Sequence, residues 1–198
     1  GDVYKRQYAN RADLFEGLSI WQDETYRKLQ GTYPVIFLSF AAVKAGNLED
    51  AKTQIKQEIT RLYWENRNLM KEDIFGEDER ELYYRTTVKM DDVTAQDSLR
   101  NLSVWMERYY GKKVIILLDE YDTPMQEAYV QGYWDEFTSF VRSLFNASFK
   151  TNPYLERAIM TGITRVSKES IFSDLNNLRV VTTTSNPVSY THLTLPTT

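Results

Sequence analysis

The feature that most constrains the fold is an apolar run that ends in two acidic residues. Residues 114–118 read VIILL, and Asp119 and Glu120 follow directly. A strand with one wet face alternates apolar and polar residues, whereas a strand buried on both faces of a parallel sheet reads as a continuous apolar run. The run therefore predicts a central strand of a parallel sheet that is covered on both faces.

Two further strands and the helices between them follow from similar patterns. Residues 33–40 contain an apolar run of strand length, and residues 155–160 are expected to form a further strand. Asn47 is a suitable N-cap for a helix with apolar residues at helical spacing, and Thr94 can cap a second helix that Gly111 ends.

Later segments are less regular. Residues 71–92 are charged and weakly patterned, which predicts a surface insertion with short helical pieces. Residues 121–124 are expected to form a loop before one long amphipathic helix, and Ser167 can cap a short helix further on. Strands that alternate with helices indicate βαβ units. The predicted fold class is therefore α/β, with a three-layer parallel sheet and helices on both faces.

Composition excludes several classes of protein. The chain has 198 residues and a net charge of −4, so bulk charge gives no indication of nucleic-acid binding. It contains no cysteine, which removes disulfides and thiolate metal sites. Its apolar runs are shorter than the roughly 18 residues of a membrane span. We therefore expect a cytoplasmic protein.

The two ends of the chain carry related sequences. Residues 188–193, VSYTHL, can be back-translated into DNA whose reverse complement, read one frame over, encodes DVYKR. Those letters stand at residues 2–6. One DNA element in opposite orientations thus explains both ends, and it resembles a translated transposase-type sequencing adapter.

This match leads to an expectation about domain organisation. We expect residues 1–7 and 187–198 to be adapter-derived, and residues 8–186 to be a partial domain from a gene fragment. His192, the single histidine, then has no catalytic role.

The acidic pair is the strongest candidate for chemistry. Ligands of parallel α/β sheets bind beyond the carboxyl ends of the strands, where Asp119 and Glu120 stand. The first carboxylate could hold Mg²⁺ through a water, and the second could orient or deprotonate an attacking water. The alternative is a strand that surfaces into a polar turn, helped by Asp122 and Pro124.

Polar residues near the end of the next strand could complete such a site. The Thr161 hydroxyl could bond the attacking water or a γ-phosphate, although a Thr-Gly pair also suits a plain strand exit. Arg165 and Lys168 could reach phosphate charge, although surface cations are common.

The longest run of residues resembles a known family. VIILLDEYDTPMQEAYVQGYWDEFTSFVRSLF, then NPYLERAIMTGITRVSKESIFSDLNNL, with YPVIFLSF and LFEGLSI upstream, resembles the AAA-ATPase-like domain of bacterial proteins. Those proteins often carry a C-terminal PD-(D/E)XK-type nuclease domain. The resemblance implies a P-loop NTPase fold that uses ATP and Mg²⁺, with Asp119 and Glu120 as the Walker B pair. It places Thr161 at a sensor-like position and matches Arg165 to an arginine after the Thr-Gly pair.

One family feature is absent from the sequence. The phosphate-binding loop should end Gly-Lys-Ser or Gly-Lys-Thr, but Gly111 and Lys112 are followed by Lys113 and precede a strand. We therefore expect the first strand and its loop to be missing. The parent protein is expected to hydrolyse ATP, and this chain by itself is expected to be inactive.

Two alternatives stay open at this stage. The domain could be a nucleotide-dependent regulatory or scaffold module for an attached nuclease-like domain, with the aromatic helix at Tyr133, Trp134 and Phe137 facing a partner or, in the simpler interpretation, packing in the core. The acids Asp119, Glu120 and Asp122 could instead form a metal-dependent nuclease site, but no Glu-x-Lys on a following strand supports it.

Overall fold

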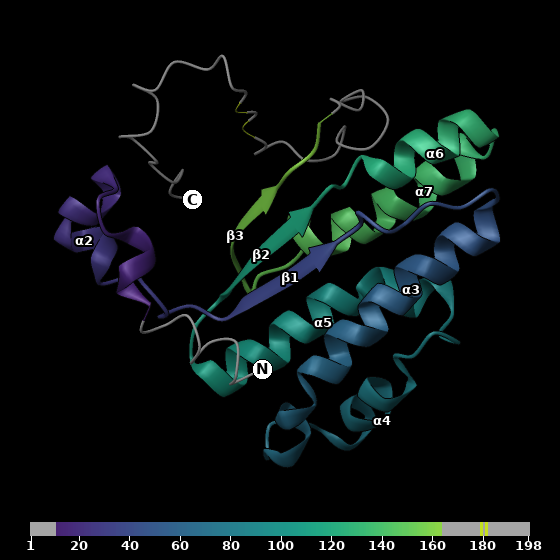
Figure 1. The fold of residues 1–198 in the computed structure, drawn as a ribbon. Coiled ribbons are helices and arrows are strands. Elements are labelled where there is room, and N and C mark those ends of the chain that lie inside the picture. Colours follow the sequence, from purple (N-terminus) through teal and green to yellow (C-terminus); the bar gives the residue numbers. More distant parts are fainter. Residues whose placement is uncertain (1–10, 164–178, 180, 182–198) are drawn as a thin grey trace.

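Three parallel strands form the sheet of this computed structural model, which describes residues 11–163, 179 and 181 (Figure 1). The strands are β1 (Val35–Ser39), β2 (Val114–Asp119) and β3 (Leu155–Met160), in the order β1-β2-β3. β2 is thus the middle strand, as its apolar run predicted. The α/β class and the parallel sheet of the prediction are confirmed.

Helices connect and precede the strands. The α-helices are α2 (Glu24–Arg27), α3 (Leu48–Glu65), α4 (Glu77–Arg85), α5 (Asp92–Tyr110), α6 (Thr123–Gln131) and α7 (Trp134–Phe145). Shorter turns are η1 (Ala12–Phe15), η2 (Ser19–Gln22), η3 (Arg67–Lys71) and η4 (Asn146–Lys150). The charged stretch at residues 71–92 contains α4, so the expected short helical piece is confirmed. The stretch does not lie wholly on the surface, because Tyr83 and Met90 are buried in the core.

The helix caps show where local sequence was sufficient. The Asn47 side chain accepts a hydrogen bond from the Asp50 N–H at 2.9 Å, and Gly111 ends α5 with φ 66°, both as predicted. The expectation that Thr94 caps α5 is wrong. The helix begins earlier, because the Asp91 carboxylate accepts the Thr94 N–H at 2.7 Å.

The segment after β2 also differs from the prediction. Residues 121–124 were expected to be a loop before one long helix, but α6 already begins at Thr123 and α7 follows as a separate helix. Gly132 separates them with φ 81°, a left-handed conformation that glycine adopts without a steric penalty. The apolar spacing continues across this break, which is why the pattern alone suggested one helix.

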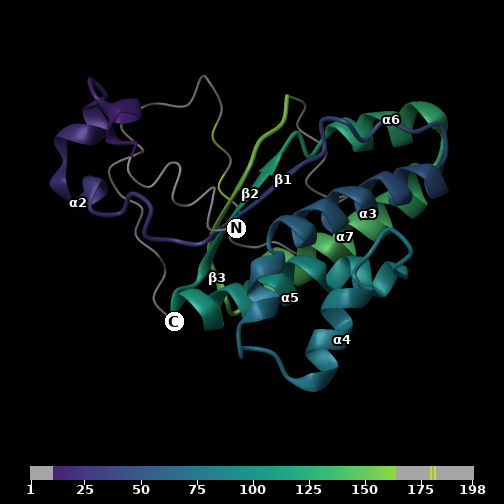
Figure 2. The same ribbon diagram turned by 60° about the horizontal axis from the view of Figure 1, so that its bottom comes forward.

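One face of the sheet is packed against helices. α3, α5 and α7 contact one another and lie on the same side of the strands (Figures 1 and 2). We call this side the helix-covered face. The side chains of β1 and β2 on this face are at most 2% exposed, and they are Ile36, Leu38, Val114, Ile116 and Leu118. Ala158 and Met160 of β3 are partly buried against the same core.

The opposite face, called the open face below, is not covered in the same way. Val35, Phe37 and Ile159 are 43%, 56% and 51% exposed. The predicted helices on both faces are therefore found on one face only within the described residues. Strand order explains this, because successive right-handed crossovers that proceed in one direction leave their helices on the same side.

Some predictions fall outside the described residues. These are the adapter ranges 1–7 and 187–198, the short helix after Ser167, and the side chains Arg165, Lys168 and His192. Within the described part of the chain, no helix has both the length and the apolar character that membrane crossing requires.

Candidate functional site

A polar residue stands at the carboxyl end of each strand of the sheet. Asp119 ends β2, Ser39 ends β1 and Thr161 directly follows β3. The Thr161 hydroxyl donates to Asp119 Oδ1 at 2.6 Å, and the Ser39 hydroxyl donates to Asp119 Oδ2 at 3.3 Å. Both carboxylate oxygens of Asp119 are therefore held by hydroxyls from the neighbouring strands.

Strand register brings these residues to one level. Ser39 pairs with Asp119 across β1 and β2, and Leu118 pairs with Met160 across β2 and β3. The main-chain N–H of Thr161 also donates to the Leu118 carbonyl at 2.9 Å, which extends the ladder past the end of β3. The position of the Asp119 carboxylate is thus set by the sheet itself.

Glu120 has an unusual backbone conformation. Its φ is 50°, and it is the non-glycine residue with positive φ in the described part of the chain. A left-handed conformation costs an L-residue roughly 1–2 kcal/mol and often marks a functional position. The turn directs the Glu120 carboxylate to the start of α6, where Oε2 accepts the Thr123 hydroxyl at 3.1 Å. Asp119 and Glu120 are neighbours in the sequence, but different hydroxyl groups hydrogen-bond to their carboxylates.

Gly162 allows two loops to approach closely beside this turn. A Cβ added to Gly162 would lie 2.6 Å from Asp122 Oδ1 and 2.9 Å from Tyr121 Cε1. Asp122 is 1% exposed, and its Oδ2 accepts the Gln126 side-chain N–H at 3.1 Å. The Thr-Gly pair is thus more than a strand exit: its threonine holds Asp119 and its glycine admits the buried Asp122.

Three of the four predicted site residues lie in the described part of the structure. It brings Asp119, Glu120 and Thr161 together, whereas Arg165 lies outside the described residues. Ser39 was missed, although it ends an apolar run just as Asp119 does, and that similarity was the available signal. Asp122 points into the α6 turn, and the described residues contain no group of three or more His, Cys, Asp or Glu side chains suited to a metal. The nuclease arrangement therefore does not form in this part of the chain.

The aromatic residues of α7 belong to the core. Tyr133 is 8% exposed and Phe137 is fully buried. The Tyr133 hydroxyl donates to the Ala45 carbonyl at 2.7 Å, and its ring meets the Phe137 ring edge-on. Core packing, the simpler interpretation of these aromatics, is confirmed for both residues.

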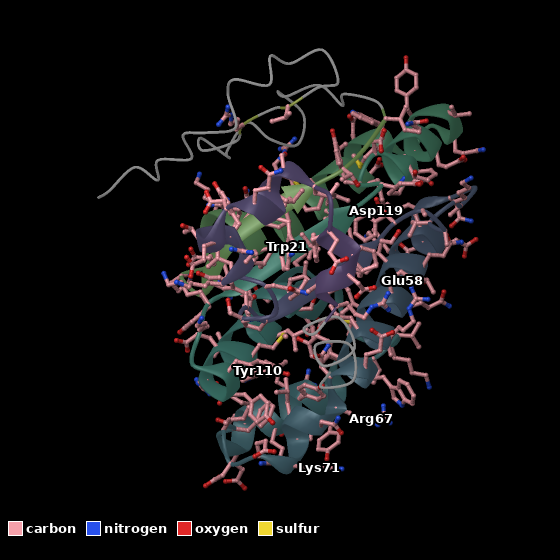
Figure 3. All side chains as sticks on the ribbon, turned by 60° about the vertical axis from the view of Figure 1, so that its left-hand side comes forward. Trp21, Glu58, Arg67, Lys71, Tyr110 and Asp119 are labelled. Carbon is pink, nitrogen blue, oxygen red and sulfur yellow. The ribbon has the colours of Figure 1, made fainter. Side chains whose placement is uncertain are left out.

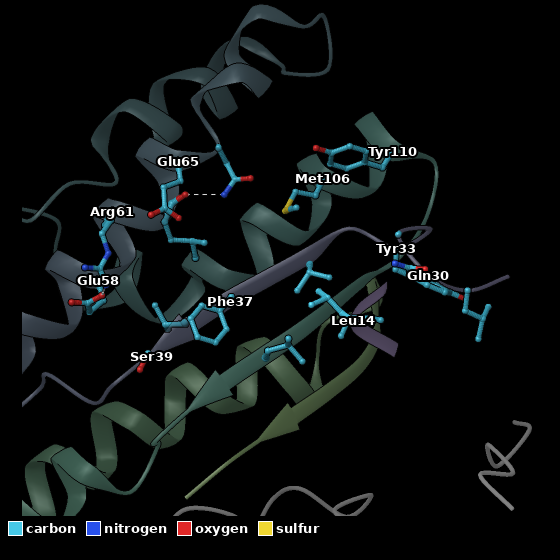
Figure 4. A pocket seen from close by; sticks show the side chains of 18 of the residues that line it. Leu14, Gln30, Tyr33, Phe37, Ser39, Glu58, Arg61, Glu65, Met106 and Tyr110 are labelled. Atoms are coloured by element: carbon cyan, nitrogen blue, oxygen red, sulfur yellow. Dashed lines mark hydrogen bonds and ion pairs between the residues drawn. The ribbon is translucent and has the colours of Figure 1, made fainter. Parts of the chain in front are cut away.

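A groove of about 880 Å³ runs along β1 and reaches the carboxyl edge at Ser39 (Figure 4). We call it the β1 groove. Apolar side chains such as Phe37 and Met106 line most of it, and Glu58 and Glu65 of α3 contribute charge. The groove extends from Ser39, the neighbour of Asp119, to Tyr110 at the end of α5. Figure 3 shows Asp119 and Tyr110 far apart, so most of the groove lies away from the acidic residues.

Comparison with known proteins gives two matches. A family model described as "Predicted AAA-ATPase" matches residues 2–172. An uncharacterized protein in the vnfD 5′ region of Azotobacter chroococcum mcd 1 is 32% identical over 69 residues, which are 34% of this chain and 13% of that protein. The chain therefore spans a small part of that relative's length. No solved structure matches it.

Proposed function

The chain belongs to the AAA-ATPase-like family, and on that premise we propose that the carboxyl edge of its sheet serves ATP hydrolysis. The observation that carries the proposal is the Asp119 carboxylate, which ends the middle strand and accepts hydroxyls from both neighbouring strands. Such a carboxylate is pre-oriented at the edge where parallel sheets bind ligands.

The donor set of this edge suits Mg²⁺. Magnesium prefers oxygen ligands, and in nucleotide sites it takes one or two carboxylates together with water and substrate phosphates. Asp119 would hold the ion, through a water, while Ser39 and Thr161 keep its carboxylate in place. When bound, the ion would neutralise phosphate charge.

Glu120 is the proposed water-orienting group. Its carboxylate lies at the start of α6 with the Thr123 hydroxyl as a support, close to Asp119 but not competing for the same partners. Thr161 could also contact the attacking water or the γ-phosphate, and Arg165 would meet phosphate charge. These roles belong to the same proposal.

The phosphate-binding loop is proposed to belong to the parent protein. This sequence contains no Gly-Lys-Ser or Gly-Lys-Thr that could cradle the phosphates. We therefore expect negligible ATP turnover by this chain alone. A C-terminal nuclease-like domain in the parent is also a proposal.

The test is Glu120→Gln in the complete gene product. Loss of a positioned general base typically costs about 10²–10⁴-fold in rate, so hydrolysis should fall by that order while ATP binding persists. The matched control is Glu136→Gln, which makes the same change at an exposed position on α7 and should leave the rate unchanged. Multiple-turnover phosphate release and equilibrium ATP binding measure the two quantities.

Two results would contradict the proposal. Unchanged hydrolysis in Glu120→Gln would show that another group handles the water. Robust turnover by the purified chain of 198 residues, abolished by the same substitution, would show that the separate phosphate-binding loop is unnecessary.

A further inference from the structure

The two acidic residues at the carboxyl edge are held in different ways. Both carboxylate oxygens of Asp119 accept hydroxyl groups, from Thr161 at 2.6 Å and from Ser39 at 3.3 Å. Glu120 Oε2 accepts the Thr123 hydroxyl at 3.1 Å, and no other donor in the described part of the chain contacts the Glu120 carboxylate. One oxygen of Glu120 is therefore held, and Oε1 remains able to accept a hydrogen bond from water.

Thr123 contacts Glu120 twice. Besides the hydroxyl bond to the carboxylate, the main-chain N–H of Thr123 donates to the Glu120 carbonyl at 3.2 Å. The first bond restrains the side chain of Glu120, and the second restrains the main chain where φ is 50°. One threonine thus fixes both parts of Glu120 from the same turn.

The start of α6, which carries Thr123, is itself anchored. Pro124 and Met125 are buried, and the Gln126 N–H donates to the Asp122 carbonyl at 3.0 Å. The ring of Pro124 sets its own φ in the first turn of the helix. The Thr123 hydroxyl therefore lies on a rigid support and defines a fixed position for Glu120 Oε2.

A fixed carboxylate matters for a group that orients water. A glutamate side chain turns about several bonds, whereas a reacting group has to be held within about 0.5 Å of its productive position. A hydrogen bond to one oxygen restrains the whole carboxylate, because the two oxygens belong to one planar group. The second oxygen can then meet a water from a constant direction.

We propose that Thr123 is a positioning residue for hydrolysis, which holds one carboxylate oxygen of Glu120 so that the other meets the attacking water. The inference rests on the proposed function, because it gives Thr123 a role in the reaction only through Glu120. Thr123 contacts this glutamate rather than nucleotide, so its loss should lower kcat and leave ATP affinity unchanged.

The first measurement uses the chain of 198 residues without nucleotide. Three-bond NMR couplings of the Glu120 side chain should report one χ1 rotamer in wild type and in Thr123→Ser, which keeps the hydroxyl. Thr123→Val keeps the branched shape and the main-chain bond but has no hydroxyl, so its couplings should report an average over rotamers. Averaged couplings in wild type, or one rotamer in the valine variant, would overturn the proposal.

The second measurement is turnover by the complete gene product. Thr123→Val should lower kcat by about tenfold, the factor that corresponds to one hydrogen bond to a charged group, with ATP affinity within about twofold of wild type. Thr123→Ser should recover most of the rate. The matched control is Thr60→Val, which removes a hydroxyl that donates to the Lys56 carbonyl at 2.7 Å within α3 and should leave kcat unchanged.

A double variant distinguishes positioning from general damage to the site. If Thr123 acts through Glu120, Thr123→Val should cost no further rate once Glu120→Gln is present. Rate losses that multiply in the double variant would show that Thr123 affects hydrolysis by another route, and would overturn the proposal.

Failure of this inference and failure of the proposed function give different results. Hydrolysis that persists in Glu120→Gln would overturn the proposed function, and with it the role of Thr123 in the reaction. A large loss in Glu120→Gln together with a wild-type rate in Thr123→Val would overturn the inference alone. Equal losses in Thr123→Ser and Thr123→Val would do the same, because the hydroxyl would then not be the cause.

Discussion

The two faces of one three-stranded sheet differ sharply in how they are used. On the helix-covered face the side chains of β1 and β2 are at most 2% exposed, while on the open face Phe37 and Ile159 are more than half exposed. The same strands supply both sets of apolar residues. Within the described residues, apolar content alone therefore does not decide burial.

The largest expected effect tests this difference with one substitution at two sites. Ile116→Ala on the helix-covered face should lower the free energy of unfolding by about 2–5 kcal/mol, because it leaves a cavity in a packed core. Ile159→Ala on the open face should cost less than about 1 kcal/mol. Ile116 is fully buried and Ile159 is 51% exposed. Urea unfolding measures both, and equal losses would show that the open face is covered in solution.

The substitution Gly162→Ala tests whether the carboxyl edge of the sheet is packed as tightly as the helix-covered face. The new Cβ would lie 2.6 Å from Asp122 Oδ1, so a backbone or side-chain shift is required. We expect a loss of about 1–3 kcal/mol in the free energy of unfolding. Gly46→Ala is the control, because nothing lies within 4 Å of the added Cβ. A loss at Gly162 no larger than at Gly46 would mean that the loops can separate freely.

A pH effect concerns the ion pairs that join α3 to α5 on the covered side. Lys52 and Lys56 contact Asp92 at 2.8 Å each. Partial burial raises the pKa of Asp92, but the hydrogen bonds from these lysines outweigh it and leave the pKa below its ordinary value. Because the pKa of Asp92 is lower in the folded state, its ion pairs stabilise the fold at pH values above the unfolded pKa of roughly 4. This stabilisation is lost as the pH falls through the folded pKa.

The measurement compares Asp92→Asn with wild type across that range. At neutral pH the variant should be less stable by about 0.5 kcal/mol, a modest value because the pair is partly exposed and screened by solvent. The difference should shrink as pH falls below roughly 4. Asp73→Asn, at an exposed acid on the surface, serves as the control and should show no such convergence. If the difference in stability between Asp92→Asn and wild type stays constant with pH, the ion pairs are not its cause.

The last prediction concerns the strained residue at the carboxyl edge, where a small gain in stability is expected. Glu120→Gly should raise the free energy of unfolding by at most about 1 kcal/mol, because glycine relieves the positive φ but adds flexibility to the unfolded chain. Glu120→Gln keeps the strain and should change stability by less than about 0.5 kcal/mol. If Glu120→Gly lowers the free energy of unfolding more than Glu120→Gln does, the positive φ of 50° does not strain the native fold.

The candidate site shows what residue patterns can and cannot reveal. Asp119 and Glu120 could be found because they directly follow an apolar run, and the end of a buried strand is visible locally. The end of an apolar run could have drawn attention to Ser39, but its contact with Asp119 could not be predicted, because the two residues are 80 positions apart. The Thr161 contact spans 42 residues in the same way. These contacts depend on strand order and register, which short segments do not encode.

The sequence by itself determined the strands, the parallel α/β class, the Asn47 and Gly111 caps, and the acidic end of the middle strand, because each depends on neighbouring residues. Only the tertiary structure decided which face of the sheet is covered and how two hydroxyls hold Asp119. A continuous apolar run shows that a strand avoids water, but it does not show which side the helices will take. The direction of the crossovers decides that, and with it the groove along β1 that remains open.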